Sequence, residues 1–190
     1  MYFSLNINIE AGDIVLIFSN NANNKLIAKG ISLATFGKFS HAGIFIDERR
    51  LLESVGGTGV QMTSIARLNI ENKNNIMVLR LKNNEKRDTF KSRLKTMAYS
   101  LQGNSYDLKG ALKSIAPFTK KNTNGFFCSE LVSFIYEELD VKLFSKPSHQ
   151  VNPNDFPKCG LLEDITDLVL SSPKRIYFKK IRREKGSMFR

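Results

Sequence analysis

The sequence is poor in the residues that crosslink proteins or bind metal ions. It contains two cysteines, Cys128 and Cys159, and two histidines, and it has no CxxC, HExxH or GxxxxGKS/T pattern. Two cysteines are too few for a disulfide scaffold, and the missing patterns give no support to a zinc centre or a phosphate-binding loop. We therefore expect a protein without a metal and without a cofactor.

Long apolar runs are also missing. No stretch of the chain reaches about 18 consecutive apolar residues, the length that indicates a membrane-spanning helix. The N-terminus has neither the basic region nor the apolar segment of a secretory signal peptide. The sequence thus predicts no membrane span and no signal peptide. A cytoplasmic location, or export by a route that needs no signal peptide, is the expectation.

Acidic residues are fewer than basic ones. Lysine plus arginine number 29 and aspartate plus glutamate 18, so the formal net charge is +11. The excess is concentrated in residues 174–190, which hold eight basic residues and one acidic residue. This stretch is either a solvated terminus or a surface that binds an anionic membrane or cell-wall polymer. Nucleic acid is the less favoured partner, because no recognition helix, zinc finger or aromatic platform pattern is found.

The length and the order of the elements predict one α+β domain over residues 1–190. Composition is that of a globular protein, with 42% hydrophobic and 25% charged residues. Strand patterns cluster in the first half of the chain and helical patterns mostly in the second. The predicted strands are 14–18, 41–47, 51–55, 60–64, 75–81 and 175–181, and the predicted helices are 25–35, 85–101, 106–115 and 126–139.

Cys128 stands at the start of the most regular helical pattern, residues 126–139. The positive end of a helix dipole stabilises an anion, so a thiol in that position has a lowered pKa and becomes a nucleophile near neutral pH. The backbone N–H of Cys128 or Ser129 would then stabilise a developing oxyanion. The alternative is that Cys128 is a small buried hydrophobic residue, as free cysteines often are.

A catalytic thiol needs a base within hydrogen-bond reach, itself oriented by a third polar group. His41 begins the strand predicted at 41–47, and Glu53 lies in the next strand, twelve residues later. A turn near Asp47 brings Glu53 opposite His41, whereas a register that differs by one residue brings Ser54 there. His41 is therefore either the base or a histidine satisfied within the core or at a sheet edge.

Three further residues have less support as site residues. His149, in a polar loop predicted at 147–157, is the rival base and otherwise a surface residue. Cys159 precedes a glycine in a predicted turn and is interpreted as structural or incidental. Glu130 follows Cys128 by two positions, and it is either a charge near the helix start or a substrate contact.

The order His41, Glu53, Cys128 and the residues around each resemble a known superfamily. This is the group of permuted NlpC-type papain-like proteins, which includes YiiX-like bacterial hydrolases and relatives of lecithin:retinol acyltransferase. The pair SHxGI and CSELV, in this order, is the most specific part of the resemblance. The matching segments are GDIVLI (12–17), SHAGIFID (40–47), LLES with the GV that follows (51–60), SYD (105–107), FFCSELVSFIY (126–136) and NPNDF (152–156).

The resemblance implies a circularly permuted papain-like fold, in which an antiparallel sheet packs against helices and the nucleophile begins a helix. It implies that Cys128 is the nucleophile, His41 the base and Glu53 the group that orients the imidazole. Tyr106 matches a tyrosine near the cleft of the family. The residues on either side of Cys128 are more similar to the YiiX-like branch than to the acyltransferases.

The predicted function is that of a cysteine hydrolase that forms a thioester acyl-enzyme. An amidase or endopeptidase acting on peptidoglycan or another peptide amide is the leading interpretation. One alternative is a phospholipid acyl hydrolase or acyltransferase that uses the same site. A second is a binding module without activity. The sequence leaves open whether the protein is a housekeeping enzyme or a secreted effector.

Overall fold

The computed structural model describes residues 4–5, 8–18, 38–68, 70, 73–107 and 125–171. The helix predicted at 25–35, most of the one predicted at 106–115, the strand predicted at 175–181 and the basic stretch 174–190 lie outside these residues. Within the described part of the chain, no helix is both long and apolar enough to cross a bilayer.

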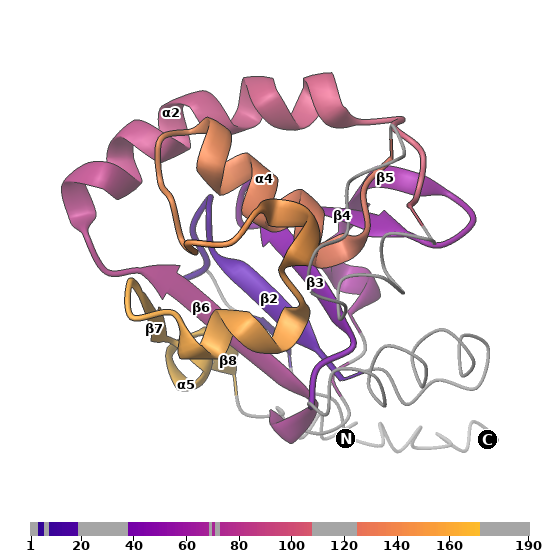
Figure 1. The fold of residues 1–190 in the computed structure, drawn as a ribbon. Helices are drawn as coiled ribbons and strands as arrows, with labels where there is room; N and C mark the ends of the chain where they lie inside the picture. The colour runs from indigo at the N-terminus through magenta and orange to yellow at the C-terminus, as the bar shows by residue number, and fades with distance from the viewer. Residues whose placement is uncertain are drawn as a thin grey trace, which may run out of the picture.

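An antiparallel sheet of six strands forms the centre of the fold (Figure 1), in the order β5-β4-β3-β2-β6-β7. The predicted strands from 14–18 to 75–81 agree with the structure to within two residues at each end, because their alternating and β-branched patterns are strong. The strands are β2 (Ile14–Ile17), β3 (His41–Phe45), β4 (Arg50–Val55), β5 (Gly59–Ser64), β6 (Ile76–Leu81) and β7 (Leu162–Asp164).

Two helices, α2 (Asn84–Leu101) and α4 (Cys128–Glu138), pack on the same side of the sheet. Figure 1 shows α4 in front of β3 and β4, and α2 along the top of the view. The rings of Phe90 in α2 and Tyr136 in α4 are 4.4 Å apart. The shorter elements are β1 (Ser4–Leu5), η2 (Ile65–Arg67), η3 (Lys73–Asn75), η4 (Ser148–Gln150), η5 (Pro153–Lys158), α5 (Thr166–Val169) and β8 (Leu170–Ser171), which pairs with β1.

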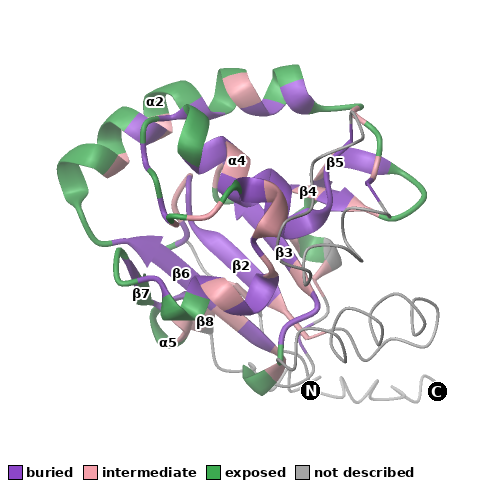
Figure 2. Ribbon diagram, in the orientation of Figure 1, coloured by how far each residue is buried: buried purple, intermediate pink, exposed green. Residues whose placement is uncertain are grey.

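Both faces of the sheet are buried, as the purple strands of Figure 2 show. Alternate residues of each strand point to opposite faces, so β2, β3, β4 and β6 each contribute to two clusters. One cluster includes Ala42 and Ile44 of β3 together with α2 and α4. The other includes Phe45 of β3, Leu51 of β4 and Val169 of α5. Each large apolar side chain buried in this way stabilises the fold by about 1.5–3 kcal/mol.

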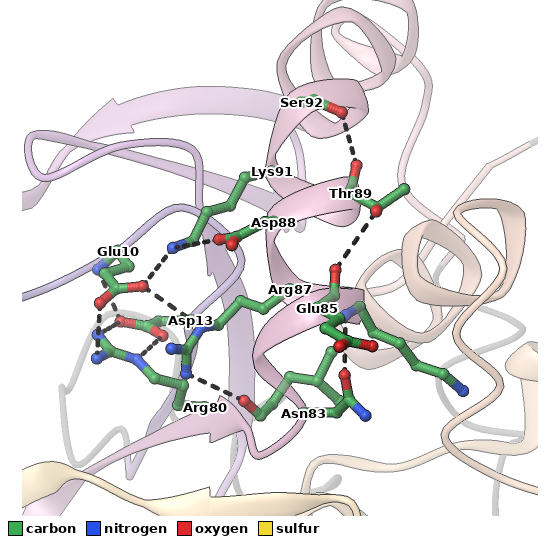
Figure 3. A network of polar contacts seen from close by, with 12 residues as sticks. Glu10, Asp13, Arg80, Asn83, Glu85, Arg87, Asp88, Thr89, Lys91 and Ser92 are labelled. Carbon is green, nitrogen blue, oxygen red and sulfur yellow. Dashed lines mark hydrogen bonds and ion pairs between the residues drawn. The ribbon is translucent and has the colours of Figure 1, made fainter.

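A buried ion pair fastens the turn before β2 to the rest of the sheet (Figure 3). The guanidinium of Arg80, in β6, donates from Nε and Nη2 to the two carboxylate oxygens of Asp13 at 2.7 and 2.6 Å. Arg80 is 7% exposed and Asp13 1% exposed. The Tyr136 hydroxyl donates to the backbone oxygen of Gly12 at 2.6 Å. The turn thus binds β6 through charge and α4 through a hydrogen bond, which fixes α4 relative to β2.

We expect Asp13→Asn to lower the free energy of unfolding by about 1.5–3 kcal/mol, because it removes the buried negative charge that Arg80 binds and leaves the guanidinium with the more exposed Glu10 carboxylate, 3.0 Å away. The matched control is Asp88→Asn, since the Asp88 side chain is 80% exposed and forms only a 3.7 Å surface pair with Lys91. Urea unfolding of both variants measures the difference. A normal midpoint for Asp13→Asn would show that this ion pair does not hold the fold.

Candidate active site

His41 and Glu53 meet across adjacent strands. The register pairs Glu53 of β4 with Gly43 of β3. Gly43 lies two residues after His41, so Glu53 is a diagonal neighbour of His41. Diagonal neighbours on one face of a sheet are within reach of long side chains. His41 Nε2 is 2.7 Å from Glu53 Oε2, and the two side chains are 21% and 13% exposed. The predicted contact between His41 and Glu53 is therefore present, and it is diagonal rather than directly opposite.

Ser54, the alternative partner of His41, points to the other face of the sheet. Its hydroxyl donates to the backbone oxygen of Phe126 at 2.6 Å, two residues before Cys128. Neighbouring residues of a strand alternate between faces. The register that places Glu53 beside His41 therefore places Ser54 on the opposite face, beside the segment that leads into α4.

Cys128 is the first residue of α4 and is 2% exposed. The helix begins two residues later than predicted, which places the thiol within its first turn, where the helix dipole favours an anion. The β3–β4 ladder ends at the Gly43–Glu53 pair. The backbone N–H of Ala42, beyond that end, hydrogen-bonds the Cys128 sulfur, as does the N–H of Ser129.

The environment of the site favours a thiolate–imidazolium pair. Burial opposes charge on both groups. For His41, hydrogen bonds and attraction from Cys128 and Glu53 outweigh burial and raise the pKa to about 10. For Cys128, burial is outweighed by the hydrogen bond and charge of His41 and by the two backbone N–H groups, so the thiol pKa is lowered overall. Both shifts favour the charged pair over the neutral thiol and imidazole.

The contact between His41 and Glu53 determines which ring nitrogen faces the thiol. Nε2 bonds the carboxylate, which leaves Nδ1 as the ring nitrogen for the hydrogen bond with Cys128. Glu53 thereby fixes both the orientation of the ring and the nitrogen that faces the thiol.

The segment 151–155 contacts both α4 and the chain that leads into β3. The Ser129 hydroxyl donates to the Val151 backbone oxygen at 2.8 Å. The Asn154 side chain accepts from the N–H of Phe39 and donates to its carbonyl, both at 2.8 Å. This amide clamp holds the chain two residues before His41. The sequence predicted Asn154 as a candidate helix cap and as part of NPNDF, and it did not indicate this contact, because nothing in the local pattern shows which distant backbone the side chain binds.

The hydrogen bond from the Ser129 hydroxyl limits how Ser129 could contact an oxyanion. Its side chain is fully buried and its hydroxyl is engaged with Val151. The part of Ser129 that lies next to the sulfur is its backbone N–H. An oxyanion contact from Ser129 would therefore come from its backbone N–H.

Tyr106 lies beside the site on an extended segment, whereas the sequence predicted the start of a helix there. Tyr106 forms a parallel bridge with Phe126 and packs against Phe127. Burial, together with the charge of Cys128, raises the pKa of the phenol. A Cβ on Gly125 would come within 2.6 Å of the Ser105 carbonyl oxygen, so the close approach of this segment to the chain before Cys128 requires glycine.

The remaining candidates occupy other positions. Glu130 is 1% exposed, and its carboxylate accepts from the backbone N–H of Phe127 at 3.3 Å, an interaction that caps the helix start. Cys159 is buried and its thiol donates to the Leu143 carbonyl. His149 is half-buried in η4, in a region predicted as an irregular loop. Among the described residues, no group of three or more histidine, cysteine or acidic side chains is arranged to hold a metal ion.

Comparison with known proteins supports the same class of fold and chemistry. A family model described as permuted papain-like amidase enzyme, YaeF/YiiX, C92 family, matches residues 8–165. The structure is similar to a crystal structure of metalloprotein YiiX from Escherichia coli O157:H7, with a TM-score of 0.58 and 19% identity over 87% of this chain and 97% of that one. No curated protein matches the sequence. The predicted permuted papain-like fold is confirmed.

We expect iodoacetamide to label Cys128 faster than Cys159 at neutral pH, although Cys159 is the more exposed of the two, at 9% against 2%. Exposure alone gives the opposite order, so the preference would have to come from the thiolate. As pH falls, labelling should decline with a midpoint well below about 8.5, the value of a free thiol. The readout is peptide mass spectrometry across a pH series.

His41→Ala serves as the control for this measurement. Without the imidazolium, the midpoint for Cys128 should move upward by more than one pH unit, because the cation that stabilises the thiolate is gone. An unchanged midpoint, or equal labelling of the two cysteines, would mean that Cys128 is an ordinary buried thiol.

Proposed function

The chain belongs to the YaeF/YiiX-type C92 family of permuted papain-like amidases, and we propose that it hydrolyses a peptide amide bond through a thioester on Cys128. The observation that carries the proposal is the position of His41, which is hydrogen-bonded to Glu53 on one side and to Cys128 on the other. Nucleophile, base and orienting group are the three parts that acyl transfer by a thiol requires.

In the proposed first step, the Cys128 thiolate attacks the carbonyl carbon, and the carbonyl electrons move to oxygen. The N–H groups of the first turn of α4 stabilise that oxyanion. The tetrahedral intermediate then collapses as the C–N bond breaks, and the Nδ1 proton of His41 passes to the leaving amine. The products of this half-reaction are a free amine and a thioester on Cys128.

The second half-reaction returns the enzyme to its starting state. Neutral His41 takes a proton from water, and the resulting hydroxide equivalent attacks the thioester carbonyl. Collapse of this intermediate releases the carboxylic acid and regenerates the thiolate beside the imidazolium. Glu53 keeps the ring oriented and stabilises its positive charge in the states where the ring is protonated.

An amide in a cell-wall peptide or another peptide is the substrate that we propose. The support is the amidase description of the family, together with an imidazole beside the thiol that can protonate the poor amine leaving group of an amide. A phospholipid ester would use the same residues, and it is the second candidate because of the basic stretch 174–190. The intact Cys128, His41 and Glu53 argue against a binding module without activity.

The substrate test compares products from purified peptidoglycan and from anionic phospholipid vesicles by mass spectrometry. We expect new amine and carboxyl ends in the peptide fraction. Cys128→Ala should remove them, and His41→Ala should slow their formation by about 10²–10⁴-fold, the usual contribution of a general acid–base group. Free fatty acid and lysophospholipid, lost in Cys128→Ala and without cell-wall products, would replace the amidase proposal with the lipid one.

We also propose that the basic stretch 174–190 draws the enzyme to an anionic surface, where each lysine or arginine adds about 1 kcal/mol of attraction. The test is charge reversal of four residues in that stretch. Binding to anionic vesicles or to anionic cell-wall polymer should weaken strongly at low salt and little at high salt. The same loss at both salt concentrations would argue against an electrostatic contact. The residues are Lys179, Lys180, Arg182 and Arg183.

A further inference from the structure

The carboxylate of Glu53 is held by side chains from both neighbouring strands. Its Oε2 atom is 2.7 Å from His41 Nε2, in β3. Its Oε1 atom accepts a hydrogen bond of 2.8 Å from the Thr63 hydroxyl, in β5. Thr63 is 9% exposed. The catalytic histidine proposed above is thus one end of a line of polar contacts that extends past Glu53 to Thr63.

The register of the sheet produces this line. Thr63 pairs with Leu51 and lies diagonally across from Glu53, just as Glu53 pairs with Gly43 and lies diagonally across from His41. All three polar side chains therefore lie on one face of three adjacent strands. From each strand to the next, the polar residue is displaced by two residues in the same direction along the sheet. Sheet twist brings one set of diagonal neighbours closer together, which is the geometry that both hydrogen bonds use.

The chemistry of the contact favours one state of Glu53. An ionised carboxylate only accepts hydrogen bonds, whereas a hydroxyl can donate one. A donor at 2.8 Å on Oε1 stabilises the negative charge and fixes the rotation of the carboxylate, so that Oε2 is directed at His41. A carboxylate held in this way keeps its negative charge at a fixed distance from the positive imidazolium and stabilises it.

We propose that Thr63 is a positioning residue of the active site, whose hydroxyl holds Glu53 in the ionised state and orientation that stabilise protonated His41. This inference rests on the proposed function, because it assigns Thr63 a role through the same histidine. Thr63 does not touch the thiol, and its effect on Cys128 passes through Glu53 and His41.

The primary test replaces Thr63 with valine, which keeps the β-branched shape and removes the donor. The readout is the pH dependence of Cys128 labelling by iodoacetamide, which needs no substrate. With Glu53 held less firmly, the imidazolium loses stabilisation, so the thiolate is less stable as well. The acidic midpoint of labelling should rise by about one pH unit, the change expected from losing one hydrogen bond to a charged group.

Two controls separate chemistry from packing. Thr63→Ser retains the hydroxyl and should keep the midpoint near that of the unmodified protein, although it loses a methyl group. Thr58→Val makes the same change at an exposed position in the β4–β5 turn and should have no effect. A midpoint that rises equally in Thr63→Ser and Thr63→Val would overturn the proposal, since it would follow packing and not the hydroxyl.

A double-mutant cycle keeps the test decisive if Thr63→Val is destabilised. If Thr63 acts through Glu53, Thr63→Val should shift the midpoint much less in a Glu53→Gln background than in the unmodified protein. Equal shifts in both backgrounds would refute the relay. Where valine prevents folding, Thr63→Ala replaces it in the same cycle.

The experiments distinguish an error in the proposed function from an error in this inference. If His41→Ala leaves Cys128 labelling unchanged, the thiol–imidazole site itself is wrong. If His41→Ala shifts the midpoint and Thr63→Val does not, the site stands and the role of Thr63 is refuted. Turnover gives a further expectation, because a less stable imidazolium narrows the active pH range from both sides and lowers the rate by about 10- to 100-fold.

Discussion

The site depends on keeping two opposite charges together where water is largely excluded. A buried thiolate or a buried imidazolium alone is costly, and burial opposes both charges here. Hydrogen bonds from several elements favour the charged pair against this cost. Glu53 in β4 bonds the ring, and the backbone N–H groups of Ala42 in β3 and Ser129 in α4 bond the sulfur. Moving any one of these elements would remove a contact that the charges need.

Much of the surrounding structure fixes those elements relative to one another. Ser54 ties β4 to the chain before α4, Ser129 ties α4 to Val151, and Asn154 holds the backbone before His41. At the far end of α4, Tyr136 bonds the turn that the Arg80–Asp13 pair anchors to β6. The helix that begins with Cys128 is therefore held at both ends, which is what a site with tight distance requirements needs.

Sequence alone indicated the parts of this site that depend on local pattern. The alternation of apolar residues around His41 and Glu53 predicted the two strands, and the helical periodicity after Cys128 predicted the helix. It did not indicate Thr63 or the clamp made by Asn154, because both depend on the register between distant segments. Tyr106 was expected at a helix start, yet it lies in an extended segment held by backbone pairing to Phe126, a contact made with a segment about 20 residues away.

The pleat of the sheet explains how the side chains of His41 and Cys128 come together. By alternation, His41 belongs with Phe45 on the face covered by α5, whereas α4 packs on the opposite face with Ala42 and Ile44. The N–H of a strand residue points along the sheet toward the neighbouring strand, so the bond from Ala42 N–H places the Cys128 sulfur level with the strands. The sulfur can occupy that position because the β3–β4 ladder ends at Gly43. The helix start fills the gap, and the ring and the thiol meet there from opposite faces.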